Sequence, residues 1–508
     1  MIPKKKMKKA YFPLLLLTLT ACTAKAPTQF VQDQAKPSIH PDYTDITIPS
    51  NIAPINFSID DEAEKFVTVM KCGDSEFTTK GRTAAVPLRR WRRLLASGDR
   101  VDVTVYAYRN GGWKQFTPFT MNVAEPIDPY ISYRLIPPGY QCFEQLTINQ
   151  RDLTSFRTKV IFCNSTIQYD DKHGSCINCH HYRNYKTDNM QFHIRQYKGG
   201  TVMVVNGELR KLNLKTDSTI SAGVYPAWHP THDFVAYSTN QTRQAFVMSG
   251  KNRIQGYDAF SDLILYDINA NEVSIIENSP NDFECYPAWS PDGRTLYYVS
   301  AHFPFEVKDG EIRENEMIPY LDQIHYDLYT KPFDPETGTW GRSRKMIDAA
   351  GMEKSITLPR MSPDGNYLMF AMGHHGVLHL YNKDADLFLL DLRTGRCRSV
   401  AELNSRESES YHSWSSNGKW LIFSSRRENG VVTRPFIAYF KEDGTFTKPF
   451  ALPQKDPEFS KEFLMAFNIP EFMIEPVKIS NHKFSRFVNR HDAEAVGFRS
   501  KREDPALN

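Results

Sequence analysis

Short runs of alternating apolar and polar residues dominate the second half of the chain, a pattern typical of strands. Four segments repeat it: "YPAWHPTHDFVAYST" from Tyr225, "YPAWSPDGRTLYYVS" from Tyr286, "LPRMSPDGNYLMFAM" from Leu358 and "YHSWSSNGKWLIFSS" from Tyr411. Each copy has an aromatic residue or a methionine as an anchor, then a turn, then an alternating run. Because Pro, Asp, Asn and Gly favour tight turns, each copy predicts two strands joined by a turn.

A second strand pair follows each copy, as in "SDLILYDINANEVSII" and "ADLFLLDLRTGRCRSV". Four strands per repeat predict the blades of a β-propeller, because repetition around a ring leaves few exposed sheet edges. Another strand pair, "TVMVVNGELRKLNLKT" from Thr201, is expected in a further blade. The predicted fold class is all-β, with a C-terminal propeller of about six blades, five to seven being compatible, over residues 196–478.

The blade segments resemble the TolB-like, WD-repeat-like propellers from about Thr201 to Pro453, most specifically in "PAWSPDG" and "SPDGNYLMF". The resemblance implies a bacterial envelope protein whose propeller serves as a platform for partners. Upstream, "INFSI", "KFVTVMKC" and "DRVDVTVYAYRNGGW" predict a small β-sandwich-like domain over residues 43–125, with a short helix at "LRRWRRLL". Residues 126–195 show no periodicity and are expected to be an irregular, functional segment. Residues 479–508 are expected to be a polar tail.

The N-terminus is typical of an export signal, with a lysine-rich start and an apolar stretch from Ala10 to Thr20. That stretch is too short to span a bilayer, which takes about 20 residues. Leu19–Cys22 resembles a bacterial lipobox, which implies cleavage before Cys22 and lipidation of that residue. Residues 1–21 are then the signal and residues 22–42 a flexible tether. No acidic run follows Cys22, so a periplasm-facing, lipid-anchored protein is expected; the alternative is an ordinary signal peptide with an incidental cysteine.

Charge and cysteine content narrow the classes of partner. The 62 basic and 59 acidic residues give a net charge of +3, which argues against a nucleic-acid partner. Five cysteines are isolated in the sequence, and an odd set in an oxidising compartment leaves at least one thiol unpaired. Cys142 with Cys163 is a candidate bridge. The five are Cys72, Cys142, Cys163, Cys285 and Cys397. The basic run Arg89–Arg93 predicts a solvated helix face, with anionic lipid or haem propionates as alternative contacts.

The strongest chemical motif is "SCINCHHYRN", with Cys176, Cys179 and His180 in a Cys-x-x-Cys-His arrangement. Two thiols at this spacing can form thioethers to the vinyl groups of one haem, and the next histidine then lies under the iron. The motif resembles the attachment site of c-type cytochromes, and TolB-like propeller lipoproteins carry it just upstream of the first blade. We therefore expect one covalent haem c with His180 as proximal ligand. His193 and Met190 are the candidate distal ligands.

Three alternatives remain for the cysteine pair. A zinc site would need His173, His181 or His193 to complete it, since no second Cys knuckle exists. A redox dithiol would need a strand and a helix of an α/β domain around it. A structural disulfide across two spacer residues is strained.

The leading functional hypothesis is a haem c protein that transfers single electrons, with a redox partner docked on the propeller. The alternative is a non-redox scaffold that binds protein or glycan in the periplasm, with the cysteine pair structural. A third hypothesis is an open haem site that binds a small molecule. The sequence has no Gly-x-Ser-x-Gly, HExxH or phosphate-loop motif, so no enzyme class is predicted. His375 and His379 have a metal-like spacing, but on a turn and strand they predict no metal site.

Overall fold

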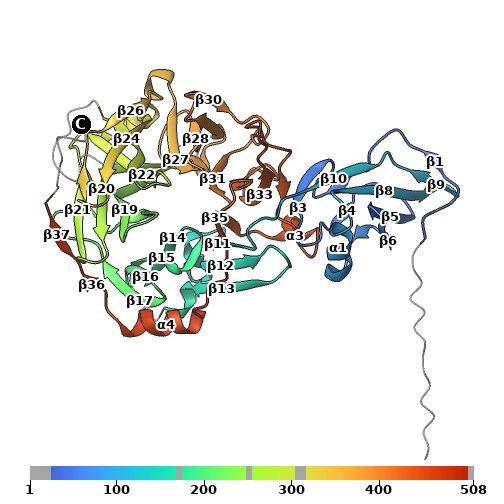
Figure 1. Cartoon of the computed structure of the whole chain (residues 1–508), viewed down its shortest axis with the longest axis horizontal. Helices are drawn as coiled ribbons and strands as arrows, with labels where there is room; N and C mark the ends of the chain where they lie inside the picture. The colour runs from blue at the N-terminus through green and yellow to red at the C-terminus, as the bar shows by residue number, and fades with distance from the viewer. Residues whose placement is uncertain (1–24, 168–173, 247–253, 304–315, 501–508) are drawn as a thin grey trace, which may run out of the picture.

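The computed structural model of the chain describes residues 25–167, 174–246, 254–303 and 316–500. The signal at residues 1–21 and the lipobox Cys22 lie outside the described residues. Figure 1 shows a ring of sheets with a smaller β domain beside it. The described chain is mostly β, and no helix in it is long and apolar enough to cross a membrane.

The small domain has a seven-stranded and a three-stranded sheet. The larger sheet contains β1 (Val31–Gln32), β3 (Ile46–Pro49), β5 (Lys65–Cys72), β6 (Ser75–Lys80), β8 (Arg100–Arg109), β9 (Gly112–Gln115) and β10 (Phe119–Ala124). The smaller contains β2 (Ile39–His40), β4 (Phe57–Ile59) and β7 (Thr83–Ala84). Because β1 and β2 belong to these sheets, the end of the expected tether is folded chain. Its Pro37, Ile39 and Pro41 are buried, and a composition-based prediction does not detect such short strands.

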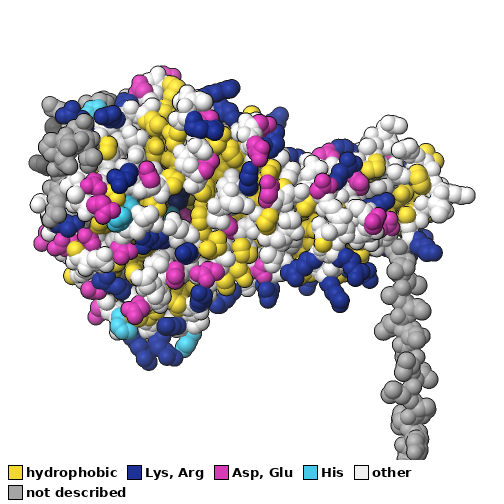
Figure 2. Space-filling model, in the orientation of Figure 1, with side chains coloured by type: hydrophobic (Ala, Val, Ile, Leu, Met, Phe, Trp, Pro, Cys, Tyr) yellow, Lys and Arg dark blue, Asp and Glu magenta, His cyan; other side chains and the backbone are white. Residues whose placement is uncertain are grey.

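Helix α1 (Leu88–Leu95) forms where the sequence predicts it. Its apolar positions share one face, with Trp91, Leu94 and Leu95 buried, and the indole Nε1 of Trp91 donates to the carbonyl of Ile52 at 2.9 Å. The arginines between them point outward and are exposed. Figure 2 shows Lys and Arg side chains gathered on this side of the small domain. The helix therefore has a buried apolar face and a solvated basic one.

Six antiparallel units of four main strands each form the ring in the described chain and are numbered here as blades 1 to 6; blades 2 and 3 are joined edge to edge in one larger sheet. Blade 1 has β14 (Ser175–Arg183), β15 (Lys186–Gln196), β16 (Gly200–Val205) and β17 (Glu208–Asn213). Blade 2 has β18 (Val224–Trp228), β19 (Phe234–Phe246), β20 (Ile254–Asp267) and β21 (Glu272–Glu277). Blade 3 has β22 (Asp282–Trp289), β23 (Thr295–His302), β24 (Tyr326–Asp334) and β26 (Arg344–Ile347), with β25 (Thr339–Trp340) beside it.

Blade 4 has β27 (Ser355–Met361), β28 (Tyr367–Gly373), β29 (Asp386–Asp391) and β30 (Arg396–Ser399). Blade 5 has β31 (Glu409–Trp414), β32 (Trp420–Ser425), β33 (Arg434–Tyr439) and β34 (Phe450–Ala451). Blade 6 has β35 (Ala466–Met473), β11 (Tyr130–Ile136), β12 (Thr147–Asp152) and β13 (Thr158–Cys163). This ring confirms the prediction of a mostly β chain with a β-propeller.

Blade 6 closes the ring with strands from both ends of the propeller. Its strand β35 comes late in the chain and pairs with β11, which comes before blade 1. The ring therefore begins at Tyr130, and residues 126–195 are not the irregular segment that the sequence predicted. Polar residues and bulges in these strands hide the alternation on which that prediction depended.

The C-terminal segment also differs from the expected polar tail. Helix α4 (Asn481–Arg490) is capped by Ser480, and it buries Phe484 and Val488 in a core with Phe162 and Phe192. Strands β36 (Glu494–Ala495) and β37 (Gly497–Arg499) add in parallel to β17 and β21. They cover the outer edges of blades 1 and 2, which would otherwise expose unpaired backbone groups.

The small domain packs against blade 5 through a shared core that includes Trp91 and Trp420. The hydroxyl of Tyr43 donates to the carbonyl of Ala451 at 3.2 Å, and the backbone N–H of Ser416 donates to Asp128 at 2.6 Å. Both bonds cross from the small domain or its linker to blade 5. The two parts are joined by buried contacts as well as by the chain.

Candidate functional site

The innermost strand of every blade contains the same backbone bulge. At the bulge one non-glycine residue has a positive φ, between 45° and 56°, and the register with a neighbouring strand shifts there. We call the bulge residue and the next three the inner-strand signature. The six copies, from blade 1 to blade 6, are Cys179–Tyr182, Tyr225–Trp228, Tyr286–Trp289, Leu358–Met361, Tyr411–Trp414 and Ile469–Phe472.

Half of the Cys-x-x-Cys-His motif belongs to this signature. Cys179 stands where blade 2 has Tyr225, and His180 stands where blade 2 has Pro226. Four of the copies are visible as repeats in the sequence, whereas those of blades 1 and 6 are not. The signal that would have found "CHHY" and "IPEF" is the aromatic fourth residue, which both retain.

The structure places the motif on extended strand β14, inside the propeller. Cys179 is 6% exposed, and burial raises the pKa of its thiol. Cys176 is half-buried and packs against a core that includes Phe162 and Phe192. Both are free thiols, so the disulfide alternative is not what the structure contains. His180 is 1% exposed, and burial lowers its pKa to about 3, although a backbone contact with Ile469 opposes the shift.

These residues do not fit a covalent haem in this conformation. The main cavities of the described chain are lined by other residues than Cys176, Cys179 and His180. A macrocycle on these thiols would need the inner strand of blade 1 to open, because Cys179 and His180 are enclosed by the neighbouring blades. The expected haem therefore stays a prediction that the geometry does not favour.

Both candidate distal ligands, Met190 and His193, have structural contacts inside blade 1. Met190, on β15, is fully buried and its side chain packs in the core that includes Phe162 and Phe192. His193 lies opposite Asn178 in the β14–β15 pairing, and its Nδ1 is 3.1 Å from the hydroxyl of Thr201. His173, which a zinc site would have used, lies outside the described residues.

The other candidate residues form no metal site in the described chain. No group of three or more His, Cys, Asp and Glu side chains there is arranged to hold a metal ion. The ring of His379 is buried, with its Nδ1 2.9 Å from the hydroxyl of Thr357. The isolated cysteines are all free thiols, so the candidate bridge between Cys142 and Cys163 is not formed.

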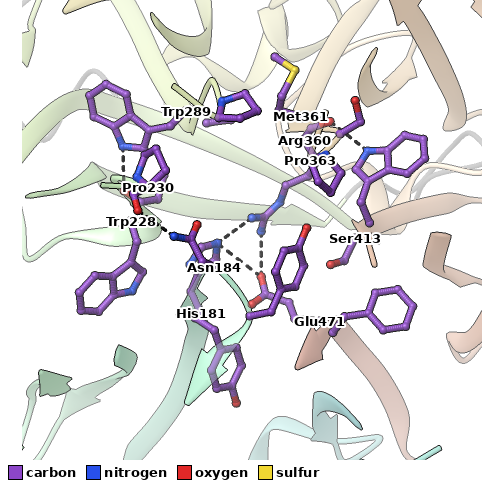
Figure 3. A pocket seen from close by; sticks show the side chains of 18 of the residues that line it. His181, Asn184, Trp228, Pro230, Trp289, Arg360, Met361, Pro363, Ser413 and Glu471 are labelled. Atoms are coloured by element: carbon purple, nitrogen blue, oxygen red, sulfur yellow. Dashed lines mark hydrogen bonds and ion pairs between the residues drawn. The ribbon is translucent and has the colours of Figure 1, made fainter. Parts of the chain in front are cut away.

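The third residues of the six signatures meet at one mouth of the propeller. Together with the fourth residues they line a cavity of about 390 Å³, here called the mouth cavity. Figure 3 shows side chains from the different blades pointing toward one another across it. The six third residues are His181, Ala227, Ala288, Arg360, Ser413 and Glu471. Blades 2 and 3 give the cavity a small apolar side, and the other four blades give it a polar side.

The polar side is held by one guanidinium. Arg360 donates from Nη1 to Nε2 of His181 at 2.9 Å and from Nη2 to Oε1 of Glu471 at 3.1 Å (Figure 3). Because arginine only donates, Nε2 of His181 accepts and its proton is on Nδ1. That Nδ1 is buried and has no partner in the described chain. Three rigid inner strands therefore hold a charged network at the mouth.

Burial sets the protonation of this network. It raises the pKa of the Glu471 carboxyl to about 7, although Arg360 opposes the shift. Burial and the charge of Arg360 hold the pKa of His181 well below its usual range. His181 is thus neutral at neutral pH, and the pKa of Glu471 lies close to that pH.

Aromatic fourth residues fix the walls between blades. The indole Nε1 of Trp289 donates to the carbonyl of Ala227 at 3.1 Å, and that of Trp414 donates to the carbonyl of Arg360 at 3.4 Å. Each bond links a signature to the preceding blade. The equivalent Nε1 of Trp228 is buried without a partner in the described chain. The same signature thus positions the cavity residues and the seams between blades.

No protein-family model matches the chain, and no curated protein is similar to it. Solved structures give distant matches to β-propeller proteins. An oligogalacturonate lyase in complex with manganese is 12% identical over 63% of this chain and 72% of its own, with a TM-score of 0.35. A prolyl endopeptidase is 12% identical over 64% of this chain and 42% of its own, with a TM-score of 0.35. A Synechocystis apocarotenoid oxygenase mutant is 12% identical over 84% of this chain and 98% of its own, with a TM-score of 0.36. At these TM-scores the matches say nothing about function. The evidence for the propeller is the ring of blades in the structure.

Proposed function

We propose that this chain is a non-redox binding protein of the bacterial envelope, with a TolB-like propeller and a lipid anchor at Cys22. Its propeller binds a segment of a protein or a glycan at the mouth cavity. The observation that carries the proposal is that all six blades contribute a residue to one cavity that holds the linked Arg360, His181 and Glu471.

The dimensions and chemistry of the mouth cavity support this proposal. Its volume of about 390 Å³ lies in the range of small-molecule sites, about 300–1,000 Å³. Its polar groups stand on paired strands, so a ligand does not have to order them. The apolar side formed by Ala227 and Ala288 gives a ligand an orientation relative to the charged side. These are properties of a recognition site.

Binding is tested by the change in unfolding temperature of the protein with libraries of envelope glycans and of peptides. A ligand that binds only the folded protein raises this temperature. Arg360→Ala should abolish the shift, because it removes the group on which the network depends. Arg100→Ala, an exposed arginine of the small domain, is the matched control and should keep the shift. A ligand that stabilises the parent and Arg360→Ala equally would place the binding site elsewhere.

A second candidate function, single-electron transfer through one covalent haem c, rests on the Cys-x-x-Cys-His sequence, although these residues do not fit the group in this conformation. The imidazole of His180 is buried and lies beside the backbone of Ile469. Cys176 and Cys179 would hold the group and His180 would bind its iron. A haem would supply one-electron redox chemistry that the side chains lack.

A pyridine haemochrome spectrum with haem staining of a denaturing gel separates the two functions. The full chain is expressed with its signal in a host that matures c-type cytochromes, beside Cys176→Ala. We expect neither protein to carry haem. A covalent haem signal in the parent that is lost in Cys176→Ala would overturn the binding proposal in favour of the haem protein.

A further inference from the structure

We propose that the ligand of the mouth cavity presents a carboxylate to Arg360, and that Glu471 takes up a proton when the ligand binds. The inference rests on the proposed binding function and names the chemistry that the site recognises. It depends on which groups of the cavity lack a partner and on the position of Glu471 beside the arginine.

Two N–H groups of the cavity wall lack a partner in the described chain. Nδ1 of His181 must carry a proton, because its Nε2 accepts from Arg360. Nε1 of Trp228 is a second N–H without a partner in the described chain. Arg360 is partly exposed to the cavity, and its planar fork matches a carboxylate. A ligand that pairs with the exposed part of Arg360 must offer acceptor oxygens.

Glu471 competes with such a ligand for Arg360. Its carboxylate accepts from Nη2 at 3.1 Å, and two carboxylates on one guanidinium repel each other. The repulsion is relieved if Glu471 binds a proton from solvent, which burial already favours. Around Glu471, His181 at 3.9 Å is held neutral, and Tyr182 and Tyr185 stay protonated because burial raises the pKa of each phenol. Glu471 is therefore the group in this cluster that titrates near neutral pH.

Matched ligand pairs test the carboxylate. Glucuronic acid is compared with glucose, and a short peptide with a free C-terminus is compared with the same peptide as its C-terminal amide. Affinity is measured by isothermal titration calorimetry on the full chain. We expect the acid of one pair to bind at least tenfold tighter than its neutral partner, and the pair that responds identifies a glycan or a peptide as the source. Equal binding of both members of a pair would overturn the carboxylate but keep the binding function. Binding by neither pair, with no stabilising ligand in the libraries, would overturn both.

Proton uptake is measured by repeating the titration in two buffers that differ in ionisation enthalpy. At pH 8 the parent should take up close to one proton per ligand, and its affinity should fall about tenfold per pH unit above 7. Glu471→Gln keeps an acceptor for Arg360 but cannot titrate, so its affinity should be the same at pH 7 and pH 8. Glu475→Gln, at a partly exposed position beyond the end of β35, is the control and should behave as the parent. A Glu471→Gln variant with the pH dependence of the parent would overturn this part of the inference.

Discussion

Strands β14 of blade 1 and β18 of blade 2 have the same bulge and nearly the same dihedral angle, φ of 54° at Cys179 and 49° at Tyr225. Their chemistry differs, because β14 continues with two histidines and β18 with proline and alanine. The same backbone bulge therefore accommodates Tyr-Pro-Ala-Trp in blade 2 and Cys-His-His-Tyr, part of a haem-attachment motif, in blade 1. A short motif therefore predicts chemistry only once its backbone context is known.

The difference also decides what each blade gives the mouth cavity. Blades 2 and 3 place alanine at the third position, and blade 1 places His181 there beside Arg360 of blade 4. A propeller brings equivalent positions of its repeats together around one axis. Substitution at a single repeated position is therefore enough to make one side of a cavity polar.

The largest expected effect concerns the reactivity of the cysteines. Burial raises the pKa of both thiols, but Cys179 is enclosed between blades whereas Cys397 is exposed. We expect iodoacetamide to modify Cys397 more than a thousandfold faster than Cys179, because Cys179 reacts only after the propeller opens. Mass spectrometry of digested samples gives both rates. Comparable rates would mean that β14 does not stay paired inside the ring.

The next effect concerns His180 and acid stability. The pKa of His180 is about 3 in the folded protein and near 6.5 when unfolded, so the unfolded chain binds more protons below pH 6.5 and the parent loses stability as the pH falls. His180→Pro gives blade 1 the residue found in four other blades. We expect the free energy of unfolding of His180→Pro to lie within about 1 kcal/mol of that of the parent at pH 7. At pH 4 it should exceed that of the parent by about 3 kcal/mol.

Urea unfolding midpoints at the two pH values measure this gain. His482→Ala on the exposed face of α4 is the control and should leave the acid limb unchanged. If the His180→Pro variant were unfolded at pH 7, the backbone conformation at the bulge of blade 1 would differ from that of the other blades.

The smallest effect distinguishes two seams between blades. Trp289 bonds the carbonyl of Ala227 in the preceding blade, while the equivalent Trp228 has no partner in the described chain. Trp289→Phe should therefore lose about 1 kcal/mol more of unfolding free energy than Trp228→Phe. Equal losses in chemical denaturation would mean that the indole N–H of Trp228 is satisfied as well.

The strands and turns of blades 2 to 5 could be predicted from the sequence, because alternation and turns rich in Pro, Asp, Asn and Gly are local properties. The same holds for the short helix α1 and its solvated arginines. The strand pair predicted from Thr201 is confirmed as β16 and β17 of blade 1. The inner strands of blade 1 and all of blade 6 are not predicted, since buried polar residues such as His180 and Glu471 interrupt the alternation. Only the tertiary structure placed "CINCHH" on an inner strand. It also brought His181, Arg360 and Glu471 together, because these residues lie far apart in the chain and meet only when the ring closes through β35 and β11.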